Sequence, residues 1–150
     1  MRKILAVASS GGHWEQLLRI TEAMCTDFEL CYVCTRPDVA PSVEGGVFYT
    51  ISDFSRNDCF RVIPALCQAV QIMIREKPHV VITTGAAPGL VAVFIAMLLR
   101  KRTVWIDSMA NVTRLSLSGR IASHFVSRTY TQWKDLATER VLYAGNIFGW

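Results

Sequence analysis

The sequence predicts an α/β fold in which one doubly wound, mostly parallel sheet is covered by helices on both faces. Short strand-like runs alternate with helical segments along the whole chain, which is the order that βαβ units produce. The length of 150 residues is that of one ordinary domain. Neither an internal repeat nor an interior linker interrupts the pattern. We therefore expect residues 1–150 to form a single domain.

The expected strands are short apolar runs, each closed by a glycine, a proline or a polar loop. In chain order they are Lys3–Ala8, Phe28–Thr35, Val47–Ile51, His79–Thr83, Thr103–Ile106, a short one near Val126–Tyr130 and Val141–Ala144. The expected helices carry apolar residues at helical spacing. They are His13–Cys25, Cys59–Arg75, Pro88–Leu99, one around Ser118–Ser123 and one after Thr131. Pro88–Leu99 is almost wholly apolar, which indicates burial on most of its sides.

Composition narrows the function classes. Hydrophobic residues make up 51% and charged residues 19% of the chain, which excludes a disordered protein and a coiled coil. The formal net charge of +4 suits an anionic ligand or a membrane surface, but it is too small to indicate nucleic acid. We therefore expect no nucleic-acid partner.

The cysteines and the apolar runs bear on the compartment. Five cysteines without regular spacing do not form a disulfide framework, and Cys31 and Cys34 lie within one strand, so they point to opposite faces. The longest apolar stretch, Leu90 to Leu99, has ten residues, whereas a spanning helix needs ~20. The first apolar run is too short for a signal peptide. The expected protein is reduced, cytoplasmic, and soluble or peripheral.

Ligands of open α/β sheets bind beyond the carboxyl ends of the strands, and three loops there are unusual. The first is Ser9-Ser10-Gly11-Gly12-His13. Its two glycines let the backbone approach a ligand closely, and the amides at the start of the following helix favour an anion such as phosphate. His13 would lie at the entrance to this ligand site. The alternative is a tight turn with His13 beside the helix cap. The loop is not the Gly-x-Gly-x-x-Gly fingerprint of dinucleotide-binding proteins, and the sequence contains no P-loop motif. Arg36 follows the second strand, where it could contact a 2′-phosphate, so an NADP-binding module remains an alternative.

The second and third loops offer further polar groups. Thr84, Gly85 and Ala86 precede the apolar helix and place free amides at its start, although close packing of that helix on the sheet explains the small residues equally well. Asp107, Ser108 and Asn111 follow the strand Thr103–Ile106. The Asp107 carboxylate could orient His13 or contact a sugar hydroxyl; the alternative is that it caps the next turn.

Together these loops and two later segments resemble a known family. The segments are Ser9-Ser10-Gly11-Gly12-His13, Thr84–Gly89, Trp105-Ile106-Asp107-Ser108, Leu115–Arg120 and Tyr143-Ala144-Gly145-Asn146. They resemble the PssD-like subunits of bacterial exopolysaccharide glycosyltransferases over nearly the whole chain. These are similar to the membrane-associated subunit of the eukaryotic two-chain enzyme that adds the second GlcNAc to dolichyl diphosphate. Gly11-Gly12-His13 also resembles the loop in the N-terminal half of MurG-type transferases.

The resemblance implies a GT-B glycosyltransferase, in which two Rossmann-like halves face each other across a cleft. Residues 1–150 would be the acceptor-side half, and a separate PssE-like subunit would bind the donor. The heteromer would move a sugar, for which the relatives suggest glucuronosyl, from a UDP-sugar to a lipid-diphosphate-linked saccharide in exopolysaccharide biosynthesis. The chain would contact UDP-sugar mainly through its partner and lie peripherally at the inner face of the cytoplasmic membrane.

The implied mechanism is inverting and uses neither a metal nor an organic cofactor. One base must take the proton of the acceptor hydroxyl, and a histidine with an ordinary pKa of ~6.5 suits that task, so His13 is the expected catalytic residue. The expected diphosphate-binding residues are Ser10, Gly11, Gly12, Thr84, Gly85 and Ala86. The expected acceptor-sugar or orienting residues are Asp107, Ser108 and Asn111. A non-catalytic scaffold that anchors and activates its partner remains the alternative from another function class.

The tryptophans, the apolar terminal residues and one basic run are expected to have packing or surface roles. Trp105, Trp133 and Trp150 are expected to pack or to form interfaces, and the apolar terminal residues Ile147, Phe148 and Trp150 to pack on a partner or back onto the domain. Arg100-Lys101-Arg102 closes a helix, where cations suit the dipole; a membrane-surface role is the alternative.

Overall fold

The computed structural model describes residues 1–43, 45–55 and 57–149, so Trp150 lies outside the described residues. Seven parallel strands form one sheet in the order β3-β2-β1-β4-β5-β6-β7. The strands are β1 (Arg2–Ala8), β2 (Phe28–Cys34), β3 (Val47–Thr50), β4 (Val80–Thr83), β5 (Arg102–Ile106), β6 (Arg128–Thr131) and β7 (Val141–Tyr143). Every pair of neighbouring strands is parallel, so the doubly wound sheet that the sequence predicts is confirmed.

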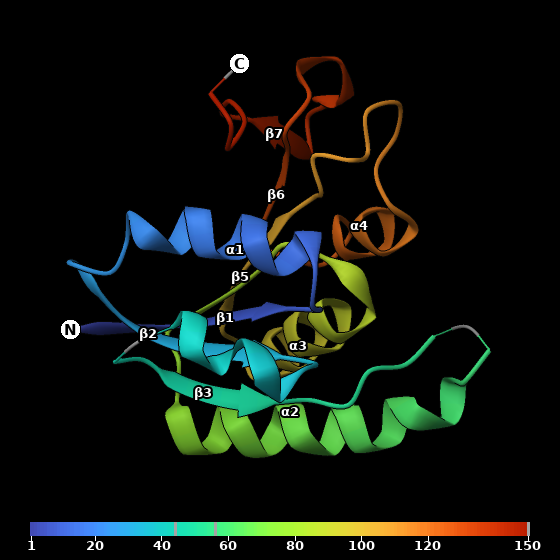
Figure 1. Cartoon of the computed structure of the whole chain (residues 1–150). Coiled ribbons are helices and arrows are strands. Elements are labelled where there is room, and N and C mark those ends of the chain that lie inside the picture. The colour runs from blue at the N-terminus through green and yellow to red at the C-terminus, as the bar shows by residue number, and fades with distance from the viewer. Residues whose placement is uncertain (44, 56, 150) are drawn as a thin grey trace.

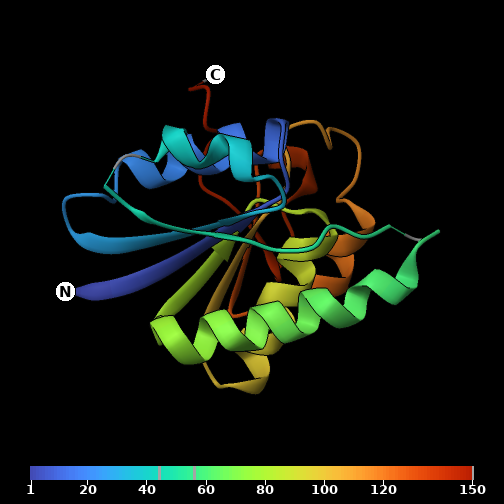
Figure 2. The same cartoon turned by 60° about the horizontal axis from the view of Figure 1, so that its bottom comes forward.

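The helices cover both faces of this sheet. They are α1 (Gly12–Glu22), α2 (Val62–Glu76), α3 (Ala86–Leu98) and α4 (Leu117–Ala122), with 3-10 turns at Pro37–Ser42, Cys59–Arg61 and Lys134–Leu136. Figures 1 and 2 show α1 on one face, while α2, α3 and α4 lie on the other. Within the described residues, no helix is long and apolar enough to cross a membrane.

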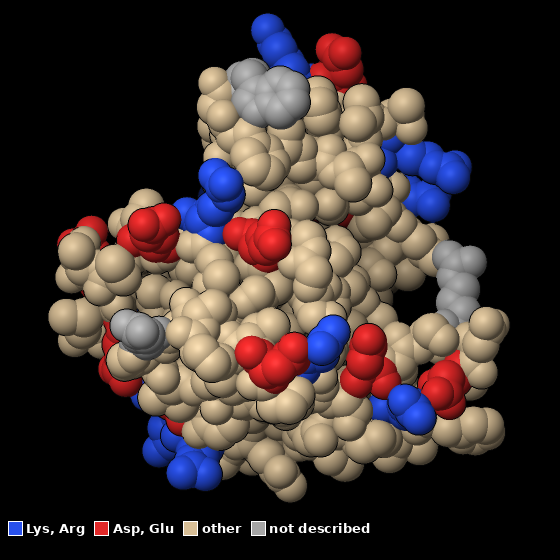
Figure 3. Space-filling view, viewed as in Figure 1, with Lys and Arg blue, Asp and Glu red and all other residues tan. Residues whose placement is uncertain are grey.

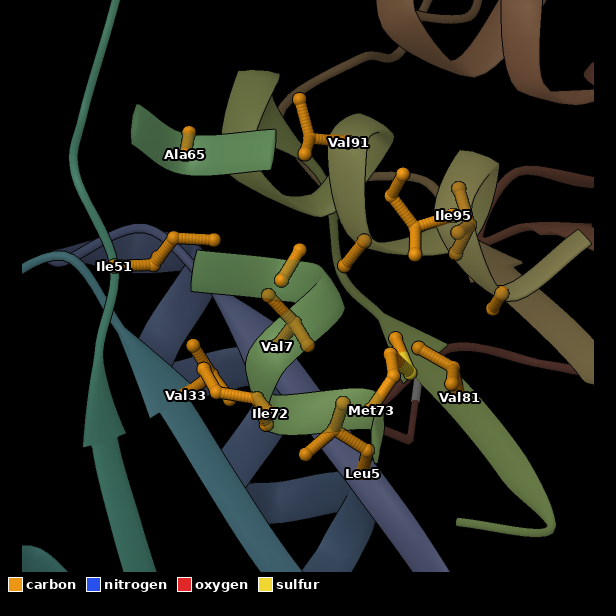
Figure 4. Packing of buried hydrophobic residues seen from close by; sticks show 14 of the residues in the cluster. Leu5, Val7, Val33, Ile51, Ala65, Ile72, Met73, Val81, Val91 and Ile95 are labelled. Atoms are coloured by element: carbon orange, nitrogen blue, oxygen red, sulfur yellow. The ribbon is translucent and has the colours of Figure 1, made fainter. Parts of the chain in front are cut away.

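Alternating side chains of the buried strands divide the core into two clusters. On the α1 face, Trp14 and Leu17 pack on Ile4, Ala6 and other side chains of the sheet. On the opposite face, the larger cluster joins α2 and α3 to the sheet, and Figure 4 shows Leu5, Val7, Met73 and Val81 among its members. α3 packs against α2, α4 and the sheet, so it buries residues on most of its sides, as expected, although Phe94 and Leu98 are exposed.

Cys31 and Cys34 belong to different clusters, which confirms that they point to opposite faces of β2. Both thiols are buried and free. Burial raises the pKa of the Cys31 thiol from 9.0 to about 12, so this thiol is a packing group and not a nucleophile.

Three details differ from the elements that the sequence predicts. The helix expected after Thr131 is a single 3-10 turn, Lys134–Leu136, because Ala137 already adopts an extended conformation. The predicted long helix Cys59–Arg75 begins with a separate 3-10 turn, and α2 itself starts at Val62. The strand expected near Val126 starts later, at Arg128.

The strand order places one crevice at the centre of the sheet. β1 and β4 are neighbours, yet the chain leaves β1 toward β2 on one side and later continues from β4 toward β5 on the other. This reversal separates the loop that enters α1 from the loop that enters α3. In doubly wound folds such a switch point, at the carboxyl edge of the strands, is where ligands bind.

Candidate functional site

His13 and Thr84 meet at the switch point through two hydrogen bonds. His13 lies in the first turn of α1, and Thr84 lies between β4 and α3. The His13 Nδ1 atom is 3.0 Å from the Thr84 carbonyl oxygen, and the Thr84 hydroxyl donates to the His13 carbonyl oxygen at 2.5 Å. The first two of the predicted loops are therefore joined directly to each other.

This contact fixes which nitrogen of the His13 ring carries the proton. A carbonyl oxygen can only accept a hydrogen bond, so Nδ1 must be the donor. In the neutral ring Nε2 then holds a free lone pair, which is the state that a general base requires. His13 is half-buried and lines a hollow of about 280 Å³.

The second loop is tightly packed around the His13 ring. A Cβ atom at Gly85 would lie 3.1 Å from His13 Cε1, and the φ angle of Gly85 is +127°, so glycine is required there twice over. A Cβ atom at Gly89 would lie 2.1 Å from the Thr83 hydroxyl oxygen, which shows how closely α3 approaches β4. The close packing that the sequence offered as an alternative is thus present, and the loop also lines the hollow through Ala86.

The first loop is open. Added Cβ atoms at Gly11 and Gly12 would meet no heavy atom within 4 Å. The helices α1 and α3 have glycines, Gly11 and Gly85, as their N-cap residues, and neither cap supplies a side-chain hydrogen bond to the first turn. Amides in the first turns of both helices are thus left for a ligand, and helix N-termini favour an anionic one.

Asp107 organises the third loop from within. Its buried carboxylate accepts hydrogen bonds from the Trp105 indole at 3.0 Å, the Asn111 amide at 3.0 Å, and both the backbone amide and the hydroxyl of Ser116 at 3.0 and 2.6 Å. Ser116 in turn caps α4. The ring of His13 is oriented by Thr84, while Asp107 fixes the residue that caps the next helix.

The hollow brings residues of all three loops together. Its lining residues are His13, Ala86, Ser108, Ala110, Asn111, Ser116, Leu117 and Ser118. Of the predicted site residues, His13, Ala86, Ser108 and Asn111 line it, and Thr84 and Gly85 support the histidine from behind. Of the remaining four, Ser10, Gly11 and Gly12 lie at the entrance to α1. Asp107 does not line the hollow; it is buried and bonded to Asn111 and Ser116, which do.

Sequence reasoning missed a buried amide network beneath the hollow. Gln16, one turn after His13, donates to the Ser108 hydroxyl at 3.2 Å and accepts from the Met109 amide at 3.1 Å. Gln132 donates to Gln16 at 2.8 Å and to the Asp107 carbonyl oxygen at 3.1 Å. A polar residue on the buried face of an otherwise amphipathic helix was the available signal for Gln16.

The C-terminal segment folds back onto the domain. The Ile147 amide donates to Gln132, and the Arg19 guanidinium lies over the Phe148 ring at 4.9 Å from its centre. A second hollow, of about 350 Å³, lies between this segment, α1 and β6. Trp105 is fully buried and the Trp133 indole donates to the Met109 carbonyl oxygen, so both tryptophans pack as expected.

Two other sequence features fall outside the site. Arg36 makes two hydrogen bonds with Asp38, at 3.0 and 2.7 Å, so its guanidinium is paired with a carboxylate. His79 accepts a hydrogen bond from the Lys3 amide, and His124 contacts Arg140. On the face seen in Figure 3, acidic and basic side chains are interspersed over the centre, and most of the surface carries neither.

Solved structures of the same fold cover nearly the whole chain. MurG from Acinetobacter baumannii superimposes with a TM-score of 0.82 over 97% of this chain and 46% of its own, at 13% identity. UDP-N-acetylglucosamine 2-epimerase from Rickettsia bellii superimposes with a TM-score of 0.75 over 99% of this chain and 46% of its own, at 11% identity. The chain therefore has the Rossmann-like fold of one half of a GT-B protein, which both transferases and epimerases use.

Two curated relatives are similar in sequence over part of the chain. The UDP-N-acetylglucosamine transferase subunit ALG14 of Yarrowia lipolytica is 39% identical over 75 residues, which are 46% of this chain and 35% of the relative. The subunit alg14 of Schizosaccharomyces pombe is 42% identical over 80 residues, 47% of this chain and 37% of the relative. The alignments thus span about a third of these relatives' own length.

A family model matches residues 49–147, about two thirds of the chain. The matched range contains the loops around Thr84 and Asp107, whereas His13 precedes it. It also runs through α2, α3, α4 and the last four strands, so the match covers most of the fold. This chain belongs to the family described as oligosaccharide biosynthesis protein Alg14 like.

Proposed function

We propose that this chain is the acceptor-side half of a two-chain, inverting GT-B glycosyltransferase. Its relatives carry the name of a transferase subunit, which supports an active site that is shared with a second chain. Its fold corresponds to about half of the MurG chain. The resemblance to PssD-like subunits implies that the second chain is PssE-like. That partner binds most of the UDP-sugar, and this chain binds a lipid-diphosphate-linked saccharide of exopolysaccharide biosynthesis.

The hydrogen bond from His13 Nδ1 to the Thr84 carbonyl oxygen carries the proposal. It leaves Nε2 as the proton acceptor at a hollow where residues of all three predicted loops meet. The chain passes the Nδ1 side of the ring at Gly85, where an added Cβ atom would lie 3.2 Å from Nδ1. A histidine that only capped a turn would not need this tautomer.

The chemical step follows from this arrangement. The acceptor hydroxyl oxygen attacks the anomeric carbon of the donor sugar as its proton passes to His13 Nε2. The bond from that carbon to the UDP oxygen breaks, UDP leaves, and the new glycosidic bond has inverted configuration. The step requires neither a metal ion nor an organic cofactor on this chain, because the base and its orienting carbonyl are both supplied by the protein.

The acceptor diphosphate binds at the open first loop in this proposal. Gly11 and Gly12 leave space in front of the first amides of α1, and Ser10 stands beside them. The second uncapped helix start, at Gly85 and Ala86, belongs to α3. Ser108 and Asn111 line the hollow and contact the acceptor sugar.

A lipid-linked acceptor places the reaction at a membrane. We propose that the complex works peripherally at the inner face of the cytoplasmic membrane, where the hollow must receive an acceptor whose lipid stays in the bilayer. A glucuronosyl donor follows only from the resemblance to PssD-like subunits, and the donor-contacting residues belong to the partner. Measuring transfer with different UDP-sugars tests that assignment separately.

The test is His13→Ala in the complex with the donor-binding partner. We expect turnover to fall by ~10²–10⁴-fold while complex formation and thermal stability stay unchanged, because a positioned base contributes that much. His124→Ala is the matched control, since His124 contacts Arg140 and lies outside the hollow. Added imidazole should restore part of the activity of His13→Ala alone. Near wild-type turnover would leave the non-catalytic scaffold as the function of this chain.

A further inference from the structure

A basic hollow lies at the amino edge of the strands, opposite the His13 site. It has a volume of about 360 Å³ and is lined by Arg2, His79, Val80, Arg100, Lys101 and Arg102. These residues come from the starts of β1, β4 and β5, three neighbouring strands, and from the end of α3. Segments that are far apart in the sequence thus bring four cations to one place.

These cations are not neutralised by the described part of the chain. The ion pairs found there involve Lys3, Arg36 and Arg61, and no carboxylate lines the hollow. Four like charges around one hollow repel each other, and the field that they create attracts an anion. The charge distribution is therefore suited to a ligand that carries phosphate groups.

Arg100 has a backbone conformation that glycine would adopt with less strain. It follows α3 with a φ angle of +56°, in the left-handed conformation that L-residues rarely adopt. Glycine is the usual residue at such a helix end. The chain has a strained arginine here, and its amide closes the helix with a hydrogen bond to the Met97 carbonyl oxygen. The backbone alone does not explain the choice of arginine.

Exposed apolar residues run from this hollow toward the His13 site. We call Phe94, Leu98, Leu99, Leu117 and Ile121 the apolar strip; their side chains are between 41% and 59% exposed. They lie on α3, on its C-cap residue Leu99 and on α4, and the two helices cover the same face of the sheet (Figure 2). Leu117 also lines the hollow of His13, and Leu98 and Leu99 directly precede Arg100.

We propose that Arg2, Arg100, Lys101 and Arg102 bind the phosphate groups of an anionic lipid surface, while the apolar strip lies at its headgroup boundary. Free phosphate would occupy the basic hollow but would leave the leucines unexplained. A lipid surface uses both features, because peripheral proteins combine apolar burial with attraction to anionic headgroups. α3 then spans ~20 Å along the membrane, from the basic hollow to the site.

A second exposed apolar pair provides the internal comparison. Phe60, in the 3-10 turn before α2, and Ile63, in the first turn of α2, are 82% and 59% exposed, but Arg61 between them is already paired with Asp58 at 2.9 Å. This pair therefore offers an exposed apolar surface, but the charge of the neighbouring Arg61 is already neutralised by Asp58. Charge complementarity assigns the anionic lipid to the end of α3 instead.

The experiment measures binding of the full chain to vesicles of phosphatidylcholine, with and without phosphatidylglycerol. Each basic residue near an anionic surface contributes ~5-fold in binding, so Arg100→Gln with Lys101→Gln should weaken binding to the mixed vesicles by ~25-fold. Lys134→Gln with Arg140→Gln removes the same charge elsewhere and should have little effect. Leu98→Gln should weaken binding, whereas Phe60→Gln should not.

Arg100→Gly separates a binding role from a structural one. It relieves the left-handed strain, so it should raise the melting temperature while it lowers vesicle binding. Inorganic phosphate at matched ionic strength should compete only weakly if the lipid surface is the ligand. Equal binding to neutral vesicles, full competition by phosphate, or loss of binding through Phe60→Gln alone would overturn the proposal. The proposal extends the proposed function, but these vesicles contain no sugar acceptor, so its failure and that of the transferase assignment are distinguishable.

Discussion

The loop after β1 and the loop after β5 both reach the carboxyl edge of the sheet, but their polar groups serve different ends. In the loop after β1, Gly11 and Gly12 face open space, and the helix that follows has no side-chain cap. In the loop after β5, the Asp107 carboxylate accepts four hydrogen bonds from its own neighbours. Unused amides at a helix start are available to a ligand, whereas the hydrogen-bonding capacity of the Asp107 carboxylate is already used within its own loop.

This difference predicts which substitutions disturb the fold and which disturb binding. Residues of the closed loop after β5 should change the free energy of unfolding strongly. Residues of the open loop after β1 should change it little and act on the ligand instead. Four substitutions test this contrast by urea denaturation, from which the free energy of unfolding in water follows by linear extrapolation.

The largest effect is expected for Asp107→Ala. It removes the acceptor of four donors, including the indole of the fully buried Trp105, and an unsatisfied buried donor costs ~1–3 kcal/mol. We expect the free energy of unfolding to fall by ~3–4 kcal/mol. Asn111→Ala is the control, because it removes only one of the four bonds and should cost ~1 kcal/mol. Equal losses for the two variants would show that the Asp107 network is not what holds the loop.

The second largest effect is expected for Gly119→Ala, and the sign of the change in the free energy of unfolding is informative. In an open helix this change stabilises by up to ~1 kcal/mol. Here the new Cβ atom would lie 2.4 Å from the Asp107 carboxylate and 2.9 Å from both the Trp105 indole nitrogen and the Ser116 hydroxyl. We therefore expect a loss of ~2–3 kcal/mol from overpacking. A stabilised variant would show that the side chains around Asp107 move readily to accommodate the new methyl group.

The contrast between the open loop after β1 and the closed loop after β5 also shows which features of the fold and of the site the sequence could predict. The strands and long helices follow from local periodicity, and the open loop follows from a glycine pair at a strand-to-helix junction, so both could be inferred. The Gln16–Gln132 bond joins residues 116 positions apart. No local pattern encodes such a pairing, because it depends on the positions of β5 and β6 in the finished sheet.

Asp107 illustrates the same limit at a single residue. Its type and its place after a strand are compatible with a catalytic, a binding or a capping role. Only its partners, Trp105, Asn111 and Ser116, show that its carboxylate is used within the loop. The missing helix after Thr131 has a comparable cause, since the Trp133 indole is held by the Met109 carbonyl oxygen and the chain turns into β7 soon afterwards.

Gly11→Ala should have a smaller effect that arises from the backbone alone. The φ angle of Gly11 is +84° and its ψ angle is −138°, a combination that alanine adopts only with strain, although the new Cβ atom would meet no neighbour within 4 Å. We expect a loss of ~1–2 kcal/mol in the free energy of unfolding. A loss as large as that of Asp107→Ala would indicate that the open loop is also closed by packing, contrary to the comparison.

Gly12→Ala should have the smallest effect on stability and a clear effect on the ligand. Gly12 is the first residue of α1, its φ angle is not positive, and an added Cβ atom would meet no heavy atom within 4 Å. The free energy of unfolding should therefore change by less than ~0.5 kcal/mol. In the complex with the partner, the same methyl group would stand in front of the amides that we propose hold the acceptor diphosphate, so the KM for the acceptor should rise while kcat stays close to wild type. Gly12→Val should strengthen this pattern. An unchanged KM in both variants would mean that the diphosphate binds elsewhere, and a fall in kcat alone would connect the first loop to the proton transfer at His13.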